Sequence, residues 1–478
     1  MNYKMILYTM GKLLMVVGAF MFLPVIVGFI YGEKHVITTF GIPIASLFIL
    51  GLLFSAKRPK DISVYSTEGF VSVAASWIMV SLLGALPFVI SREIPNYVDA
   101  LFETVSGFTT TGATIATNIE GMSKSILFWR SFTHWLGGMG ILMFVLAIMS
   151  SNDVRTMHMM RAECAGPNVG RLVSRSSNTA RILYGIYILL TVLETLFLLL
   201  GGVPLYDSII HACSSAGTGG FSIYGDSIGH YNSLYVEMVI AIFITLFGVN
   251  FNLYYYILIR KYSLAYKNEE VRIYFGAIAL ATIAITANIV HLYSTVGGAL
   301  RHSFFMVAAT ITSTGFATAD ITTWPRFSQT LLLMLMFLGS CAGSTGGGMK
   351  VSRIVILIKT GIKELKYLAN PHAVATVKMD GKPVDNSVVR GATSYLILFI
   401  LLFMISLLLL MFDKYTIEES MSAVTTCINN IGYGVGRFGP AGSFAGLKPF
   451  SKIVLSFDML LGRLEIYPLI MLFAARKR

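Results

Sequence analysis

The chain has 478 residues, of which 55% are hydrophobic and 13% are charged, and its formal net charge is +12. Because a soluble domain is about one quarter charged, this composition excludes an ordinary soluble protein and predicts an integral membrane protein with several spans. The four cysteines, Cys164, Cys213, Cys341 and Cys427, stand far apart and form no CxxC pair, so a metal or disulfide framework is not expected.

Ten apolar stretches are long enough to cross a bilayer as helices. In chain order they lie near residues 9–30, 36–56, 67–90, 126–150, 180–202, 233–259, 272–296, 328–358, 390–412 and 449–475. We interpret the first as a membrane helix and not as a cleaved signal peptide, because it is long and lacks a clear small-residue cleavage site.

A shorter segment lies within each of the last four pairs of stretches, and the four short segments share one pattern. Each opens with a polar residue, continues with mostly apolar or small residues, and reaches a glycine in a tip rich in Thr, Ser, Gly or Asn. A helix of about ten residues reaches only about 15 Å, half of the roughly 30 Å hydrocarbon core, so it can enter and turn back but cannot span. The segments are 99–114 (DALFETVSGFTTTGAT), 207–222 (DSIIHACSSAGTGGFS), 302–317 (HSFFMVAATITSTGFA) and 419–434 (ESMSAVTTCINNIGYG), with aligned glycines Gly112, Gly220, Gly315 and Gly432.

The order of long and short segments predicts the fold. We expect two N-terminal transmembrane helices in residues 1–60, followed by four repeats in residues 61–160, 161–265, 266–370 and 371–478. Each repeat consists of a helix, a short pore helix and a second helix. The fold class is then an all-α integral membrane protein, in which four pseudo-symmetric repeats surround a central pore.

Lysine and arginine residues predict the orientation in the membrane. With the N-terminus in the cytoplasm, the inside segments hold 25 of the 36 Lys and Arg residues, and an excess of these residues marks the cytoplasmic side. Both termini are then cytoplasmic, and the four short helices enter from outside. We interpret the basic loops as topology determinants and as a docking surface, and we expect no binding of nucleic acid.

The four tips have the chemistry of a cation filter. Short helices that enter from outside point their C-terminal ends, which carry about half a negative charge each, toward the membrane centre. A glycine at the shared position permits a positive φ, so that consecutive carbonyl oxygens can face one axis and replace the hydration shell of a monovalent cation. One alternative stays open, namely that the glycines only permit tight loops or close helix packing. The predicted filter comprises Thr110, Thr111, Gly112, Ala113, Thr218, Gly219, Gly220, Phe221, Ser313, Thr314, Gly315, Phe316, Asn430, Ile431, Gly432 and Tyr433.

Several motifs resemble those of one transporter superfamily. Residues 431–434 (IGYG) resemble the VGYG filter signature of potassium channels. The four-repeat plan, TTTGAT at 109–114, GSCAGSTGGGMK at 339–350 and GRLEIYP at 462–468 are similar to the Trk/Ktr/HKT superfamily of potassium transporters. The resemblance covers essentially the whole chain, and the two added N-terminal helices resemble its bacterial TrkH/TrkG branch.

The resemblance implies a function and partners. It implies potassium as the transported ion, no organic cofactor in this chain, and a multi-pass protein of the bacterial inner membrane that is not an enzyme. Within the superfamily, Gly in the first tip goes with potassium and Ser with sodium, so Gly112 favours potassium. The tips depart from strict TVGYG, which implies weaker discrimination than in a potassium channel. The expected partners are a second copy in a homodimer, the lipid bilayer, and a cytosolic TrkA-type nucleotide-binding regulatory subunit.

The eighth apolar stretch is interrupted by a run of glycines, and a broken helix at membrane depth is typical of a gate. The predicted gate comprises Gly339, Cys341, Gly343, Ser344, Thr345, Gly346, Gly347, Gly348, Lys350 and Arg463. A simple helix kink remains an alternative. The P-loop spacing of residues 343–348 is a weak alternative, because Met349 stands where a lysine should follow and no strand precedes the run.

Arg463 lies within the last apolar stretch, where a charge costs about 2.5–3.5 kcal/mol on insertion scales. We interpret it as a positive barrier below the filter, and the alternative is an ion pair with Glu194, Glu237 or Glu465. His134, His211 and Glu103 also lie in apolar segments. No HExxH or GxSxG motif accompanies them, so we expect packing or hydrogen bonding to the pore helices.

The sequence therefore predicts potassium uptake through a filter of backbone carbonyls. Two alternatives are a secondary transporter for another solute and a cation transporter that does not discriminate sodium from potassium. A third, an intramembrane enzyme, would need a convergent nucleophile or metal set. Co-transport of protons or sodium is left open by the residues.

Overall fold

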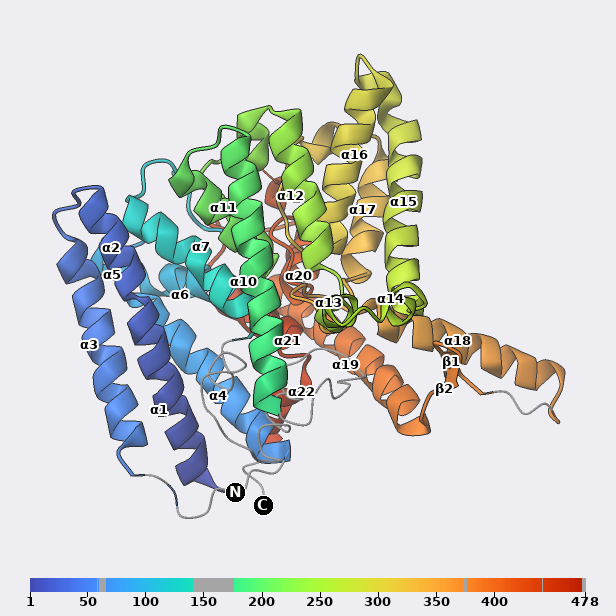
Figure 1. The fold of residues 1–478 in the computed structure, drawn as a ribbon, viewed down its shortest axis with the longest axis horizontal. Helices are drawn as coiled ribbons and strands as arrows, with labels where there is room; N and C mark the ends of the chain where they lie inside the picture. The colour runs from blue at the N-terminus through green and yellow to red at the C-terminus, as the bar shows by residue number, and fades with distance from the viewer. Residues whose placement is uncertain (58, 60–65, 141–175, 373–375, 441, 475–478) are drawn as a thin grey trace.

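The computed structural model describes residues 1–57, 59, 66–140, 176–372, 376–440 and 442–474. These residues are mostly helical (Figure 1). The N-terminal part contains α1 Tyr3–Phe20, α2 Phe22–Ile30 and α3 Val36–Ser55, and the first repeat contains α4 Ser66–Gly84, α5 Leu86–Ile90, α6 Tyr97–Phe108 and α7 Lys124–Gly138. The second repeat contains α10 Ser176–Leu200, α11 Leu205–Gly217, η1 Ser227–Tyr231, α12 Leu234–Phe247, α13 Phe251–Leu258 and α14 Tyr262–Tyr266.

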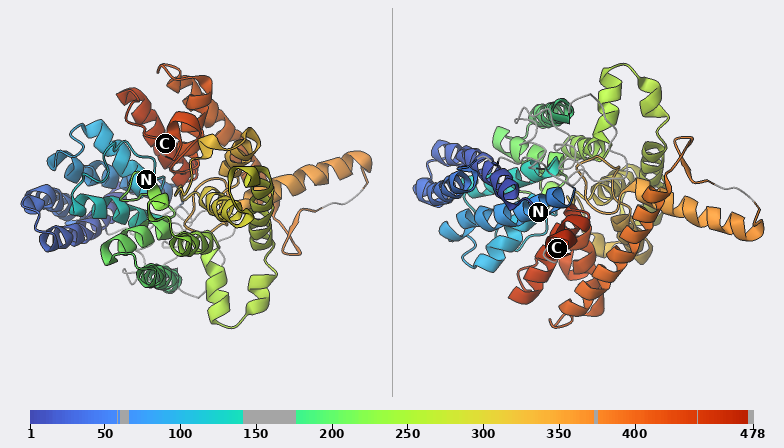
Figure 2. Two further views of the ribbon diagram at one scale, coloured as in Figure 1. Left: turned by 90° about the horizontal axis from the view of Figure 1, so that it is seen from above. Right: turned by 90° about the horizontal axis from the view of Figure 1, so that it is seen from below.

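The third repeat contains α15 Glu269–Ile289, η2 Val290–Leu292, α16 Val296–Ile311, η3 Ile321–Thr323, α17 Arg326–Phe337 and α18 Val351–Ala369. The fourth contains α19 Asn386–Leu410, α20 Ile417–Ile428, η4 Gly436–Phe438, α21 Pro449–Arg463 and α22 Tyr467–Ala474. Figure 2 shows the four repeats in chain order around the centre of the molecule, with α1 and α3 at one edge. The predicted fold class agrees with this arrangement.

The short helices α6, α11, α16 and α20 are the predicted pore helices, and polar residues begin three of them. Asn96 Oδ1 accepts a hydrogen bond from the backbone N–H of Val98 (2.9 Å) at the start of α6. Thr295 caps α16, and Thr416 forms a capping box with Glu419 at the start of α20. Such caps satisfy N–H groups that have no partner within the helix.

The second helix of each repeat ends or bends before the end of its predicted span, which the apolar stretches did not predict except in the third repeat. α7 ends at Gly138, and Gly140 beyond it has a φ of 82°. α12 and α13 meet at 91°. Residues 338–350 separate α17 from α18, and residues 464–466 separate α21 from α22. Among the residues that the structure describes, six helices are long and apolar enough to cross a membrane, or seven if the bent α12–α13 pair is one span, against ten predicted spans. The predicted span 126–150 extends into residues 141–150, which lie outside the described residues.

A small hairpin was not predicted either. β1 Lys378–Met379 pairs antiparallel with β2 Lys382–Pro383. The two turn residues, Asp380 and Gly381, have φ values of 52° and 76°, as a type I′ turn requires, and Asp-Gly is a preferred sequence for that turn. The hairpin and α18 project from the body of the molecule (Figure 2).

Candidate functional site

The four pore helices end in the same backbone conformation. The residue two places before each aligned glycine is left-handed: φ is 55° at Thr110, 53° at Thr218, 56° at Ser313 and 53° at Asn430. The N–H of the next residue then donates to the carbonyl five residues earlier, and this distance is 2.9 Å in all four helices. This is the Schellman motif, formed here without glycine at the left-handed position. Unlike sequences thus give one geometry, which supports their alignment.

The aligned glycines meet around a common centre. A Cβ added at Gly112 would lie 1.9 Å from the carbonyl oxygen of Gly219, and one at Gly220 would lie 2.0 Å from that of Thr314. A Cβ at Gly315 would lie 2.6 Å from the backbone nitrogen of Gly432, and one at Gly432 would lie 3.1 Å from the carbonyl oxygen of Thr111. The contacts run from the first tip to the second, third and fourth and back to the first, so the tips form a closed ring.

Exposure follows the same fourfold pattern. In each tip the aligned glycine is partly exposed, while the two residues before it and the one after it are buried. The predicted positive φ is present at Gly112 (81°), Gly220 (80°) and Gly315 (77°). It is wrong for Gly432, whose φ is not positive. The structure therefore brings all sixteen predicted filter residues together, and their binding of an ion stays a prediction.

Side chains behind the ring connect neighbouring tips. Asn430 Nδ2 donates to Thr111 Oγ1 (3.0 Å), which joins the fourth tip to the first. The hydroxyls of Tyr433 and Thr310 lie 2.8 Å apart and join the fourth repeat to the third. Because these groups are buried, each connection restricts how far the carbonyls can move.

Arg130 of α7 joins the first two tips, and the sequence reasoning did not single it out. Its Nε donates to Glu103 Oε1 (2.6 Å) and its Nη1 donates to the carbonyl of Ser222 (2.9 Å). Glu103 also accepts from the N–H of Ile115 (2.9 Å). The guanidinium lies 3.6 Å from the ring centre of Phe221. A charged residue within an otherwise apolar helix was the signal that could have identified it.

The two histidines have the expected packing and hydrogen-bonding roles. The ring of His134 stacks on that of Phe221, with centroids 4.1 Å apart. His211 hydrogen bonds through Nδ1 to the carbonyl of Asp207 (2.8 Å) and through Nε2 to Ser222 Oγ (3.2 Å). Among the described residues no group of three His, Cys, Asp or Glu side chains could hold a metal ion.

The loops beyond the tips are also joined. The N–H of Gly225 donates to Glu120 Oε1 (2.8 Å), which links the first repeat to the second. This hydrogen bond holds the pKa of the exposed Glu120 carboxyl below its ordinary value.

The predicted gate segment 339–350 lies against the third and fourth tips. The N–H of Gly347 donates to Ser313 Oγ (2.6 Å). A Cβ added at Gly347 would lie 2.6 Å from Cβ of Asn430, and one at Gly346 would lie 2.9 Å from the carbonyl of Thr312. Only residues without a side chain permit these approaches, so the glycines allow the segment to lie directly against the ring.

Other members of the predicted gate shape and anchor the segment. Its two ends are joined, because the N–H of Gly339 donates to the carbonyl of Met349 (2.8 Å), and the N–H of Cys341 donates to the carbonyl of Gly248 (3.0 Å) where α12 ends. Gly343 and Gly348 both have a φ of 71°. The buried Lys350 donates from Nζ to the carbonyl of Gly346, and the hydroxyls of Ser340 and Ser344 lie 2.7 Å apart.

Arg463, the last residue of α21, reaches from the fourth repeat to two others. Its Nη1 donates to the carbonyl of Thr345 (2.7 Å) in the gate segment, and its Nη2 donates to the carbonyl of Gly137 (2.7 Å) and to that of Gly138 at the end of α7. Two of the carboxylates considered as its partners pair elsewhere: Glu237 with Arg301 (2.5 Å) and Glu465 with Arg353. Arg463 therefore lies where three helix breaks converge.

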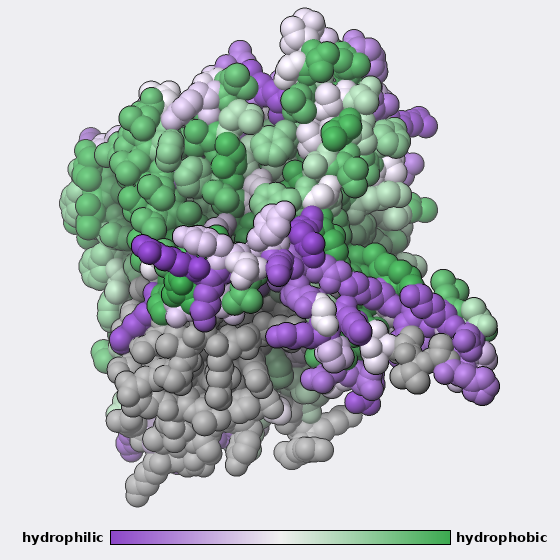
Figure 3. Space-filling view, turned by 45° about the vertical axis from the view of Figure 1, so that its right-hand side comes forward, coloured by the Kyte–Doolittle hydropathy of each residue, from purple (hydrophilic) through white to green (hydrophobic). Residues whose placement is uncertain are grey.

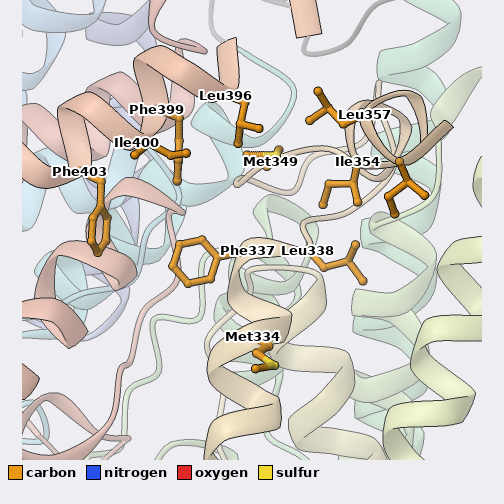
Figure 4. Close-up of a pocket in the computed structure, with 11 residues that line it drawn as sticks. Met334, Phe337, Leu338, Met349, Ile354, Leu357, Leu396, Phe399, Ile400 and Phe403 are labelled. Atoms are coloured by element: carbon orange, nitrogen blue, oxygen red, sulfur yellow. The ribbon is translucent and has the colours of Figure 1, made fainter. Parts of the chain in front are cut away.

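An apolar groove of about 490 Å³ opens between α17, α18 and α19 (Figure 4). Its lining residues are Met334, Phe337, Leu338, Met349, Ile354, Leu357, Ile358, Leu396, Phe399, Ile400 and Phe403. Met349 belongs to the segment 339–350, so the groove reaches the predicted gate from the side. On the face shown in Figure 3, hydrophobic residues cover most of the upper part, and hydrophilic residues form a band below them that continues along the projecting segment.

Comparisons with known proteins cover nearly the whole chain. Residues 34–477 match the TrkH family, described as cation transport protein. The Trk system potassium uptake protein TrkH of Salmonella typhimurium is 35% identical to this chain, and the alignment covers 99% of both chains. The Trk system potassium uptake protein TrkG of Escherichia coli K12 is 33% identical, with 98% of both chains covered. The crystal structure of the potassium transporter TrkH from Vibrio parahaemolyticus has a TM-score of 0.88 and 30% identity, covering 99% of this chain and 98% of that one.

Proposed function

Since this chain belongs to the TrkH family of cation transport proteins, we propose that it takes up potassium ions across a bacterial inner membrane. The predicted superfamily is thereby confirmed. The observation that carries the proposal is the closed ring of tips, in which the four partly exposed residues are the aligned glycines. Backbone carbonyls around such a ring can replace the hydration shell of a potassium ion.

Inward movement needs no chemical step in this chain. One charge that crosses a potential of 100 mV gains about 2.3 kcal/mol. At about 1.4 kcal/mol per tenfold, this free energy supports a concentration ratio of roughly fiftyfold. The membrane potential is therefore a sufficient driving force for potassium uptake.

The test is rubidium uptake by the purified protein in proteoliposomes. With an inside-negative potential, the vesicles should accumulate rubidium, and dissipating the potential should abolish the accumulation. Uptake of an organic solute in place of rubidium would contradict the proposal and favour a secondary transporter. Equal rates for sodium and rubidium would favour a cation transporter without discrimination.

The segment 339–350 and Arg463 form the gate in this proposal. The segment lies against the third and fourth tips, and Arg463 holds it through the carbonyl of Thr345. A fixed positive charge next to the path repels a cation, so the filter can select ions while conduction stays slow.

The orientation and the regulatory partner follow from the charges and the family. Both termini lie in the cytoplasm, and the pore helices enter from outside. A cytosolic TrkA-type nucleotide-binding subunit docks on the basic segments, of which 350–390 is the most basic with eight Lys and Arg residues. Isolation of the protein from its native membrane should recover such a subunit, and repeated isolation without one would contradict this part of the proposal.

A second copy of the chain covers the apolar face next to the groove. Along α18 the exposed residues Ile358, Ile362, Leu365 and Leu368 recur at intervals of three or four, so they share one face of the helix. This stripe begins at the groove, to which Ile358 contributes. Association of two copies through this face would remove the exposed apolar surface from water.

A further inference from the structure

Glu270, in the first turn of α15, holds both the gate segment and the start of α18. Its Oε1 accepts hydrogen bonds from the backbone N–H of Ala342 (2.7 Å) and from that of Ser352 (3.0 Å). These two N–H groups lie on either side of the glycine run 343–348. Glu270 is only 4% exposed. A single buried carboxylate oxygen therefore ties the start of the gate segment to the first turn of α18, on the other side of the glycine run.

The neighbouring residue, Glu269, points to the surface and joins three other elements. Its carboxylate pairs with Lys359 of α18. Lys359 Nζ also donates to the carbonyl of Lys378 (2.8 Å) in the hairpin. Asp380, in the hairpin turn, accepts from the backbone N–H of Glu269 (2.7 Å) and from Asn268 Nδ2 (3.2 Å). The start of α15, the projecting α18 and the hairpin thus form one polar cluster.

The hydrogen bonds of Glu270 and the polar cluster around Glu269 differ in the free energy that is lost when they break. Hydrogen bonds to a buried carboxylate are strong, and moving the gate segment away would leave the charge of Glu270 buried and unsatisfied. The cluster around Glu269 is more exposed, so water can replace its partners. Because Glu269 and Glu270 are consecutive in one helical turn, a displacement of the hairpin or α18 that shifts the start of α15 also shifts the Glu270 carboxylate.

We propose that Glu270 is a positioning residue that latches the gate segment, and that Glu269 connects this latch to the hairpin and α18. The latch keeps residues 342–352 against the filter until the start of α15 moves. The proposal rests on the proposed role of residues 339–350 as a gate. In this proposal, a displacement of α18 or of the hairpin is what moves the gate segment.

The experiment compares Glu270→Ala, Glu270→Gln and a control, Glu364→Ala, which removes an exposed carboxylate from α18. Two readouts are measured on the full chain in proteoliposomes: rubidium flux, and the rate at which N-ethylmaleimide labels Cys341, determined by mass spectrometry of that peptide. Cys341 is fully buried in the gate segment and reports its displacement independently of transport.

Glu270→Ala should raise both the labelling rate and the rubidium flux about tenfold, which corresponds to about 1.4 kcal/mol. The rubidium-to-sodium ratio should stay the same, because the filter is not altered. Glu270→Gln keeps an acceptor oxygen of the same shape and should restore most of the protection. Glu269→Ala should raise labelling by a smaller factor, and the control should match the original protein.

Unchanged Cys341 labelling in Glu270→Ala would overturn the latch. If that variant does not fold, Glu269→Ala still decides: the absence of any rise in its Cys341 labelling rate relative to the control would overturn the proposal. If the unaltered protein does not transport rubidium, the proposed function is refuted. The Cys341 labelling rates of the variants would still test the latch in that case.

Discussion

At the scale of single residues, each quarter of the ring depends on one glycine. Gly112, Gly220 and Gly315 combine a positive φ with a neighbouring backbone atom less than 3 Å from where a Cβ would stand. An L-residue in the left-handed region costs about 1–2 kcal/mol before any contact is considered. The carbonyls beside these glycines are therefore in positions that a side chain would disturb.

Gly112→Ser should lower the preference for potassium over sodium about tenfold, or about 1.4 kcal/mol. The added Cβ would lie 1.9 Å from the Gly219 carbonyl oxygen, so the first two tips must separate and the ring loses its spacing. The measurement is the ratio of rubidium to sodium flux in proteoliposomes. Gly297→Ser is the matched control, because nothing lies within 4 Å of a Cβ there. An unchanged ratio in Gly112→Ser would count against the filter assignment.

Arg463→Ala should raise rubidium flux about tenfold. Removing a fixed positive charge next to the path removes its repulsion of a cation, and a tenfold change in flux corresponds to about 1.4 kcal/mol. The substitution also frees the Thr345 carbonyl in the gate segment. Arg326→Ala, which removes an exposed arginine at the start of α17, should leave the flux unchanged. A decrease in a folded Arg463→Ala protein would reject the barrier interpretation.

At the scale of elements, the sequence predicted the short helices but not the breaks in the long ones. The aligned glycines and the length of the apolar segments are local signals, and they located α6, α11, α16 and α20. A break in a helix depends on what packs against it. The bend after Phe247 is joined to residues about one hundred positions later, since the carbonyl of Gly248 accepts from Cys341. Only the glycine run at 339–348 was strong enough to predict a break by itself.

The same limit applies to the side chains of the site. The filter positions could be predicted because four copies of one pattern occur in the chain. Arg130 occurs in one repeat only, and its role depends on the approach of Ser222 and Glu103 in the folded protein. Likewise, Glu270 resembles any acidic residue in the first turn of a helix in the sequence, and its role depends on its contact with the gate segment in the folded protein.

The close packing of long and short helices leads to a prediction for Gly137 of α7. A Cβ added there would lie 1.9 Å from the carbonyl oxygen of Phe108 at the end of α6. Gly137→Ala should therefore destabilise the protein by about 1–3 kcal/mol, as overpacking does. Thermal unfolding in detergent measures the effect. Gly185→Ala, in α10 with nothing within 4 Å of a Cβ, should be neutral or stabilising, and equal behaviour of the two variants would contradict the packing argument.

At the scale of the whole molecule, the interior of the described part of the chain consists of two large hydrophobic clusters and a small third one around Ile6, Met10 and Val71. Of the two large clusters, one joins the N-terminal helices to the first and fourth repeats, and the other joins the second and third repeats. Ile431 and Tyr433 of the fourth tip belong to the second cluster. The filter therefore connects the two halves of the molecule.

The exposed apolar face leads to a prediction about assembly. Replacing Ile358 and Leu365 with lysine should convert the proposed dimer into monomers, because both side chains are more than half exposed in the single chain and two charges would then face each other across the interface. Light scattering of the purified protein measures the mass. Lys366→Ala, on α18 away from the apolar stripe, is the control. A dimer that persists in the double variant would place the contact elsewhere.

The ring is built from a single polypeptide, and this has a consequence for how its ion preference can change. In a channel made of four identical subunits, one altered codon changes every side of the conduction path at once. Here the tips are encoded separately and already differ, from TGA at 111–113 to IGY at 431–433, so one side can be altered while three are kept. Selectivity in such a molecule can be adjusted in small, unequal steps.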